Sequence, residues 1–283
     1  MAVTPIRRDL EFHLPADKMG KWHPAGKPHS LFMDTLSVFF PTGERFFINS
    51  LRPFRERITD PELLKSLNAF IGQEGMHGRE HMEYNAKLAG AGIPVDLQEA
   101  LVDKLLDFGK ARLGEDYQLA ITIALEHLTA ILGDILLREP RLLEGADPHF
   151  AALWRWHALE ETEHKAVAFD VYEKMVGKGP RAYALRTVSL VIATSIFWAL
   201  VYPFWIQNLR ARGQLGNWRG IWMAVKFQWL IPGALRRTIP DWLDYFKPGF
   251  HPWDHDNREY LERIDDLVEQ IAAGYDAPRV VKA

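Results

Sequence analysis

The chain has 283 residues, of which 48% are hydrophobic, 25% are charged and none is cysteine. A formal net charge of −3 excludes the strongly basic surface with which proteins bind nucleic acid. The lack of cysteine excludes disulfides, thiolate catalysis and iron–sulfur ligation, so histidine and carboxylate side chains are the metal ligands that remain. Residues 1–14 contain no apolar signal segment, and we expect a cytoplasmic protein.

The first 30 residues are rich in Pro, Gly, Lys and His without helical periodicity, which predicts an extended arm. A helical pattern then runs from about residue 31 to 58. We expect a break at Pro41–Gly43 and a bend or an end at Pro53, because proline removes a backbone donor and clashes with the preceding turn.

Four further helices follow. Asp60 and Pro61 are typical of a helix start, and this helix should continue to Ala89 before a Gly-rich stop. The other helices are predicted at 97–113, 115–138 and 147–177, the last again with an Asp-Pro start. No stretch alternates as a strand would, so the pattern predicts an all-α fold.

The last third, residues 178–283, has a different composition. Residues 187–208 contain no charged side chain and are long enough to cross a bilayer, which needs about 20 apolar residues. The alternative is a buried core helix, since Ser, Thr and Pro dilute this run and basic residues flank both ends. A Trp-rich segment at 218–237 follows, and 256–273 predicts a charged amphipathic helix.

Two helical stripes carry the strongest functional signal. Each stripe places three metal-ligating side chains on one face over two turns, with two histidines and one glutamate. The spacings are mirrored, with i, i+3 and i+7 in one stripe and i, i+4 and i+7 in the other. The stripes consist of Glu74, His77 and His81, and of His157, Glu161 and His164.

Glu44 and Glu126 complete the pattern. Each lies in an apolar neighbourhood, where a carboxylate is unfavourable unless it is paired or binds a metal. One glutamate from each of two helices, with Glu-x-x-His from each of two others, is the ligand pattern of di-iron carboxylate bundles. His81 is either an eighth ligand or a residue that orients a ligand, and Glu160 and Glu163 either face water or hold a histidine from behind.

These motifs resemble the ferritin-like di-iron carboxylate superfamily over residues 31–177. The additional histidine at 157 is similar to the p-aminobenzoate N-oxygenase branch, which implies ligation by the seven residues other than His81. The sequence motifs at 72–81 and 160–172, together with Lys247–Asp254, resemble more closely a bacterial family catalogued as predicted metal-dependent hydrolases. The resemblances imply a ferritin-like four-helix bundle with a crossover helix and additional C-terminal helices.

We therefore expect a two-iron site, with manganese and zinc as alternatives, in an O2-activating oxidoreductase that acts on a hydrophobic small molecule. Such chemistry would need a separate electron donor, a ferredoxin or a reductase, because the chain has neither cysteine nor a dinucleotide fingerprint. The alternatives are a two-metal hydrolase and a non-catalytic metal-binding bundle. A homodimer and membrane contact through 187–208 are left open.

The predicted organisation has three parts. Residues 1–30 form the arm and residues 31–177 form the metal-binding bundle. Residues 178–283 form helices that pack on the bundle or touch a membrane.

Overall fold

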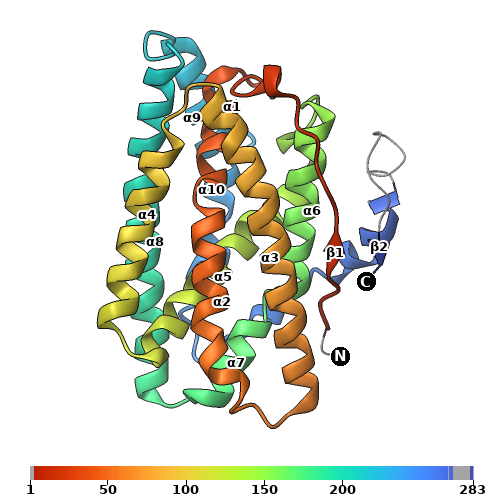
Figure 1. Cartoon of the computed structure of the whole chain (residues 1–283), viewed down its shortest axis with the longest axis vertical. Helices are drawn as coiled ribbons and strands as arrows, with labels where there is room; N and C mark the ends of the chain where they lie inside the picture. The colour runs from red at the N-terminus through yellow and green to blue at the C-terminus, as the bar shows by residue number, and fades with distance from the viewer. Residues whose placement is uncertain (1–2, 267, 270–280, 283) are drawn as a thin grey trace.

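A computed structural model describes residues 3–266, 268–269 and 281–282 (Figure 1). Helices dominate the described chain, so the all-α prediction is confirmed. The two strands, β1 (Arg8–Asp9) and β2 (Val281–Lys282), contain two residues each and pair antiparallel, with Arg8 opposite Lys282. The helices are α1 (Lys27–Ser37), α2 (Phe40–Arg55), α3 (Pro61–Gly90), α4 (Val95–Arg112), α5 (Glu115–Arg138), α6 (Pro148–His164), α7 (Val167–Met175), α8 (Pro180–Ala211), α9 (Trp218–Trp229), α10 (Ala234–Arg237) and α11 (Ile239–Asp244).

The starts of α3 and α6 follow the sequence signals. The Asp60 carboxylate accepts hydrogen bonds from the backbone N–H groups of Glu62 and Leu63, and Asp147 accepts one from His149. In each case a proline stands next, at the first helical position, where its missing donor has no consequence.

Two predicted boundaries were wrong. The first helical region breaks at Val38–Phe39 rather than at Pro41–Gly43, because Pro41 lies in the first turn of α2, where no backbone donor is needed. The predicted end at Pro53 is displaced by two residues, because Pro53 lies inside α2 and the helix ends at Arg55. The proline therefore removes only one hydrogen bond, in the last turn of the helix.

The predicted helix over 147–177 is two helices, α6 and α7, separated at Lys165–Ala166. Lys165 turns away at this junction, and its Nζ donates to the backbone oxygen of His255 at 2.6 Å and to Asn257 Oδ1 at 2.7 Å. The predicted C-terminal helix at 256–273 begins as a 3-10 helix, Arg258–Arg263. Its residues 267 and 270–273 lie outside the described residues.

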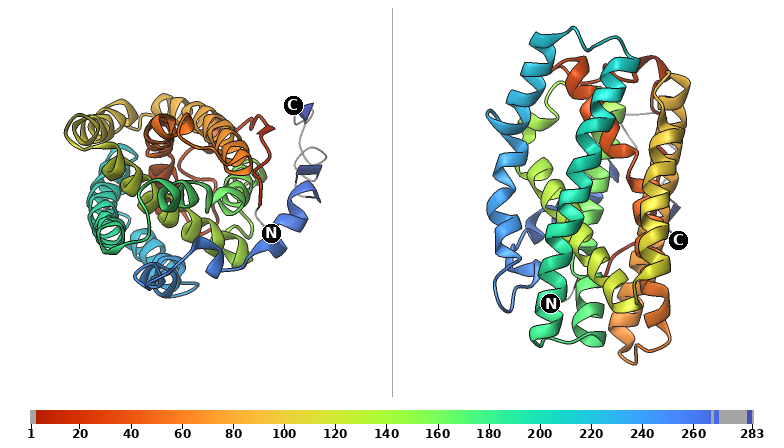
Figure 2. Two further views of the ribbon diagram at one scale, coloured as in Figure 1. Left: turned by 90° about the horizontal axis from the view of Figure 1, so that it is seen from below. Right: turned by 90° about the vertical axis from the view of Figure 1, so that its left-hand side faces the viewer.

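The four helices that carry the predicted ligands pack against one another. Helix α2 contacts α3 and α5, and α6 contacts the same two helices from the other side (Figures 1 and 2). Gly133 of α5 lies directly against Ala158 of α6, since a Cβ at Gly133 would approach the Ala158 backbone to 3.2 Å. The missing side chain therefore permits a close α5–α6 contact at the level of the predicted ligands. The ferritin-like assignment of this arrangement remains a prediction.

Helix α8 runs outside these four and packs on α5 and α1. Both α5 and α8 have the length and apolar composition of a membrane span, which by itself is weak support for one. The two differ in burial, because 67% of the apolar window of α5 is buried inside the protein and only 33% of that of α8. The buried-core alternative for 187–208 therefore describes only the inner face of α8.

The arm is held to the helices by a buried carboxylate. Asp34 of α1 accepts hydrogen bonds from Trp22 Nε1 at 2.8 Å and from the Tyr84 hydroxyl of α3 at 2.6 Å. Burial raises the pKa of Asp34 to about 7, although both donors favour its ionised form.

We expect Asp34→Asn to remove a pH-dependent contribution to stability. Between its usual pKa of 3.8 and about 7, Asp34 stays protonated in the folded chain and ionises in the unfolded chain. The unfolded state then binds fewer protons, so the free energy of unfolding falls as the pH rises through this window. Urea unfolding at several pH values should show that Asp34→Asn gains stability relative to the wild type as the pH rises. Parallel curves would contradict this, and Asp17→Asn, an exposed change in the arm, is the control.

Candidate metal centre

The structure brings seven of the eight predicted ligands to one place inside the helices. They come from α2, α3, α5 and α6, and all of them are buried. Six of them form two groups in which one ligand atom from each residue lies within 4.8 Å of the others. The first group is Glu44, His77 and His157, and the second is Glu74, Glu161 and His164.

Glu161 connects the two groups. Its Oε1 lies 2.9 Å from His157 Nε2 in the first group, and its Oε2 lies 3.3 Å from His164 Nε2 in the second. Glu126 stands beside the second group, with Oε2 3.9 Å from His164 Nε2. A carboxylate with one oxygen toward each group is suited to bridge two cations.

The carboxylates of Glu44, Glu74 and Glu126 present the clearest sign of a cation site. All six of their side-chain oxygens are buried, and none receives a hydrogen bond from the described part of the chain. Burial, together with the repulsion of neighbouring carboxylates, raises the pKa of each of the three well above its usual value. Such groups are unfavourable in a protein interior, and coordination of metal ions would compensate them.

His77 and His81 are in the neutral form that an imidazole needs in order to bind a metal. Burial lowers the pKa of His77 and His81 well below the usual value, so both are neutral at pH 7. His77 Nδ1 faces the first group, 3.9 Å from Glu44 Oε1, while its Nε2 lies 3.2 Å from Glu160 Oε2. One ring nitrogen toward the metal and the other toward a carboxylate is the usual setting of a ligating histidine.

Glu160 supports His77 from behind, which is one of the two alternatives that the sequence left open, whereas the buried Glu163 contacts Arg8 and Gln73 and, within the described chain, not a histidine. Arg8, in the arm, donates to Glu160 Oε1 at 3.2 Å and to Glu163 Oε2 at 2.9 Å. Gln73 Nε2 donates to Glu163 at 2.6 Å. Arg8 is 5% exposed, so these ion pairs are buried, and the guanidinium lies beside both Glu163 and Glu160, the residue that contacts His77.

His81 lies behind His157. Its Nε2 is 2.8 Å from His157 Nδ1, and its Nδ1 is 2.8 Å from the Ser37 hydroxyl. Both nitrogens are engaged with protein groups, and Ser37 is fixed in turn by a 2.8 Å bond to Asn85 Oδ1. These contacts favour the orienting role of His81 over ligation, a choice that the sequence did not decide.

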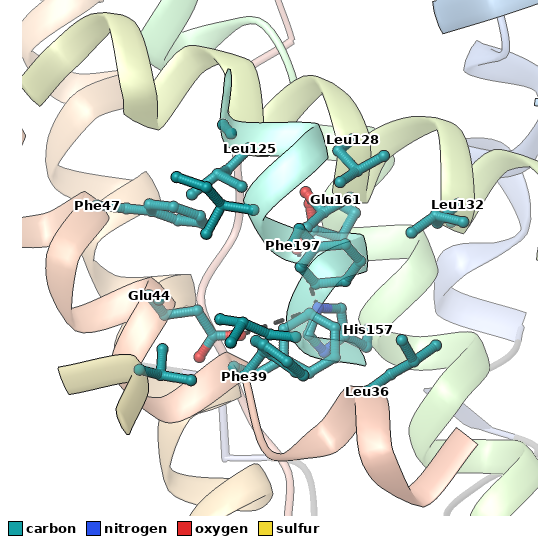
Figure 3. Close-up of a pocket in the computed structure, with 18 of the residues that line it drawn as sticks. Leu36, Phe39, Glu44, Phe47, Leu125, Leu128, Leu132, His157, Glu161 and Phe197 are labelled. Atoms are coloured by element: carbon teal, nitrogen blue, oxygen red, sulfur yellow. Dashed lines mark hydrogen bonds and ion pairs between the residues drawn. The ribbon is translucent and has the colours of Figure 1, made fainter. Parts of the chain in front are cut away.

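A cavity of about 500 Å³ meets the centre on the side of the first group. Glu44, His157 and Glu161 line one wall, and the side chains across from them are apolar (Figure 3). They include Leu36, Phe39, Phe47, Leu125, Leu128, Leu132 and Phe197. The only hydroxyl that lines the cavity near the centre is that of Thr129, within the described chain, and it donates to Glu161 Oε2 at 2.6 Å.

Three further side chains on the ligand-bearing helices α3 and α5 have partners away from the centre. Tyr84 donates to Asp34, and His127 lies 3.2 Å from the backbone oxygen of Asp241. Asp134 accepts from Asn257, and so holds the C-terminal segment rather than a metal-binding histidine.

The sequence did not reveal Arg8 or Ser37, because neither lies on a stripe and the arm has no periodicity. The role of Gly78 could not be predicted from the sequence either. It lies between the two α3 histidines, and a Cβ there would come within 3.3 Å of Glu44 Oε2, so glycine leaves room for the carboxylate from α2.

The profile of one family matches residues 6–256, a range that includes every predicted ligand, and the family is described as predicted metal-dependent hydrolases. No curated protein and no solved structure matches the chain significantly.

We expect His157→Ala and His81→Ala to differ in metal binding. His157→Ala removes a side chain of the first group, so metal content, measured by plasma mass spectrometry, should fall by about half or more. His81→Ala should keep the stoichiometry and weaken affinity by about 10- to 100-fold, since it only frees the ring of His157.

The exposed His13 gives the matched control, because His13→Ala removes an imidazole from the arm and should change neither quantity. If His81→Ala lowered the stoichiometry as much as His157→Ala, His81 would be a ligand. Circular dichroism of each variant separates loss of metal from loss of fold.

Proposed function

We propose that this chain, which belongs to the family of predicted metal-dependent hydrolases, is an enzyme that uses two metal ions to transform a largely apolar small molecule. The observation that carries the proposal is the cavity of about 500 Å³ that ends on Glu44, His157 and Glu161. Its volume is in the range of small-molecule sites, and its lining is apolar apart from a few polar groups.

The residues fit two cations. Glu44, His77 and His157 would hold one ion, Glu74, Glu126 and His164 the other, and Glu161 would lie between them. Bound metals would supply Lewis acidity and an activated water for hydrolysis, or electrons for the reduction of O2. The histidine and carboxylate donors suit iron, manganese or zinc.

The protein's own residues would bind and orient the reactants. The apolar walls exclude water from the substrate and leave the wall with Glu44, His157 and Glu161 as the polar side. Glu160 and His81 fix the rings of His77 and His157, and Thr129 fixes one oxygen of Glu161. These contacts hold the ligand atoms in place before a substrate arrives.

Hydrolysis is the reaction to test first, because the family description names it. O2 activation is the second candidate, and a specific observation favours it. Next to the centre, the described lining offers Thr129 as its sole hydroxyl, which is already committed to Glu161, so the lining provides no free hydroxyl to assist a leaving group. An oxidation at an apolar carbon needs no such donor, although it would need a separate electron donor such as a ferredoxin or a reductase.

The two reactions are separated by one set of measurements on metal-loaded protein. A hydrolase should cleave p-nitrophenyl esters of medium-chain acids equally well with and without air, and should lose this activity in Glu161→Gln but not in His13→Ala. An oxygenase should bind about two irons per chain, show a ferric absorption that bleaches on reduction, and consume O2 when a donor and an apolar substrate are supplied.

Ester cleavage that is unaffected by Glu161→Gln would remove hydrolysis at this centre. Iron that does not react with O2 after reduction would remove the second candidate. If the protein bound none of iron, manganese and zinc, the proposal as a whole would be contradicted.

The far end of the cavity bears on the class of substrate. His29 of α1 and Gln228 of α9 line it there, both are buried, and His29 Nδ1 and both amide atoms of Gln228 have no partner among the described residues. Leu136, which also lines the cavity, is ten positions along α5 from Glu126, or roughly 15 Å from the level of the metal centre at 1.5 Å per residue. Burial lowers the pKa of His29 well below its usual value, so this end is uncharged at pH 7. We infer a substrate with a long apolar body and an uncharged hydrogen-bonding group.

Gln228→Leu should therefore weaken binding of a medium-chain alkanol by about tenfold and leave binding of the matching alkane unchanged, as judged by displacement of a fluorescent probe. Stability should stay the same or rise, because the change removes buried polar atoms that lack partners. An equal loss for alkanol and alkane would show that the cavity had changed shape, and would contradict a polar contact.

A further inference from the structure

One side of the molecule exposes an apolar surface. Helices α4, α8 and α9 lie side by side there, with α8 in the middle (Figure 2, right). We call this surface the apolar face. Its exposed side chains are Leu97, Leu101, Leu105 and Phe108 of α4, Val188, Val191, Ile192, Ile196 and Ile206 of α8, and Trp218, Trp222, Met223 and Trp229 of α9.

Exposure on this face is extensive for such large apolar groups. Trp218 is 77% exposed, Phe108 64% and Ile192 53%. The α4 residues recur at helical spacing, so they form a stripe that points outward and not a set of scattered positions. Contiguous apolar patches of this kind mark contact with a protein or a membrane.

The cavity opens on the apolar face. Leu105 and Phe108 of α4 and Ile192 and Ile196 of α8 line the cavity and are also exposed. The rim through which an apolar molecule would reach the metal centre thus belongs to the same surface.

The charge on the α8 and α9 side of the apolar face indicates its partner, whereas α4 carries four acidic and three basic side chains. Residues 174–240 contain ten basic side chains and no acidic one, in a chain whose net charge is −3. Among them, Arg210 and Arg219 are exposed and have no acidic partner in the described chain, and Arg219 follows Trp218 directly. Tryptophan beside unpaired arginine is typical of segments that insert into the interface of an anionic membrane.

Helix α8 is tied to the protein along its inner face and does not leave it to cross a bilayer. Asn208, which is fully buried, accepts from Gln98 of α4 at 2.9 Å and donates to Thr35 of α1 at 2.9 Å. Near the other end of α8, the buried Arg186 donates to the backbone oxygen of Tyr245 at 2.7 Å. Removing these polar groups into lipid would be strongly unfavourable.

We propose that the apolar face lies in the interface of an anionic lipid bilayer without spanning it, and that the cavity takes its apolar substrate from that bilayer through the rim formed by α4 and α8. The second half of this inference rests on the proposed function. The first half stands on the surface alone.

The test is co-sedimentation of the full chain with vesicles of phosphatidylcholine, with and without phosphatidylglycerol. We expect binding to the anionic vesicles that weakens with added salt, and weaker binding to the neutral ones. Trp218→Ser/Trp222→Ser should reduce partitioning by about tenfold or more, because it removes the two most exposed tryptophans of the face. Met82→Ser, which changes an exposed apolar side chain on α3, is the matched control and should bind as the wild type does.

Three results would overturn the proposal: no binding of the wild type to either vesicle, equal binding of the double variant, or a dimer in solution that the double variant dissociates without any vesicle binding. The third would assign the face to a second copy of the chain. His157→Ala should bind vesicles normally, so a failure at the metal centre does not imitate a failure at the membrane. Bromine-labelled lipids should quench the fluorescence of the wild type more than that of the double variant if the face inserts.

Discussion

The structure depends on placing a cluster of ionisable side chains in the middle of a helical protein. Glu44, Glu74, Glu126 and Glu161 lie within the same buried region as three imidazoles, and four carboxylates so close together repel one another in a medium of low dielectric constant. Cations would turn that repulsion into attraction, and the surrounding contacts are arranged accordingly: the His77 imidazole is neutral, and the outward nitrogens of His77 and His157 meet Glu160 and His81. The positions of α2, α3, α5 and α6 all follow from the need to bring these groups within reach of common ions.

The N-terminal arm completes this arrangement. Glu160 lies behind His77 and Glu163 contacts the arm, and Arg8 is the buried cation that pairs with both. Because Arg8 belongs to the arm, and Trp22 and Asp34 hold the same segment farther along, the arm connects to the metal centre by charge and to α1 and α3 by hydrogen bonds. Buried pairs of this type destabilise a protein strongly when one partner is removed. The arm is thus part of the site and not an appendage to it.

The sequence could predict whatever followed helical periodicity. The stripes that carry Glu74 and His77, and His157, Glu161 and His164, needed only the regular geometry of a helix, and the Asp-Pro starts of α3 and α6 needed only local capping chemistry. Arg8, Ser37 and Gly78 could not be found this way, because their roles depend on which helix lies beside them. The break between α6 and α7 was missed for a similar reason, since the contacts of Lys165 lie with Asn257, far along the chain. Local patterns therefore predicted the candidate ligands, and tertiary contacts decided what supports them.

The mainly apolar lining of the cavity extends from the candidate metal centre to the outer surface. If the site acted on a polar molecule from water, its walls would carry donors and acceptors along the route. Most of the described lining is instead apolar, and apart from Glu44, His157 and Glu161 at the centre its side chains with polar atoms are Arg112, Thr129, Trp154, His29 and Gln228. An apolar molecule that enters such a route from lipid loses little, because transfer of apolar surface between two apolar media is nearly neutral, whereas a polar molecule from water would lose its hydration. The same helix, α8, provides the inner wall through Phe197 and the exposed rim through Ile192, so its uncharged run at 187–208 serves both surfaces at once.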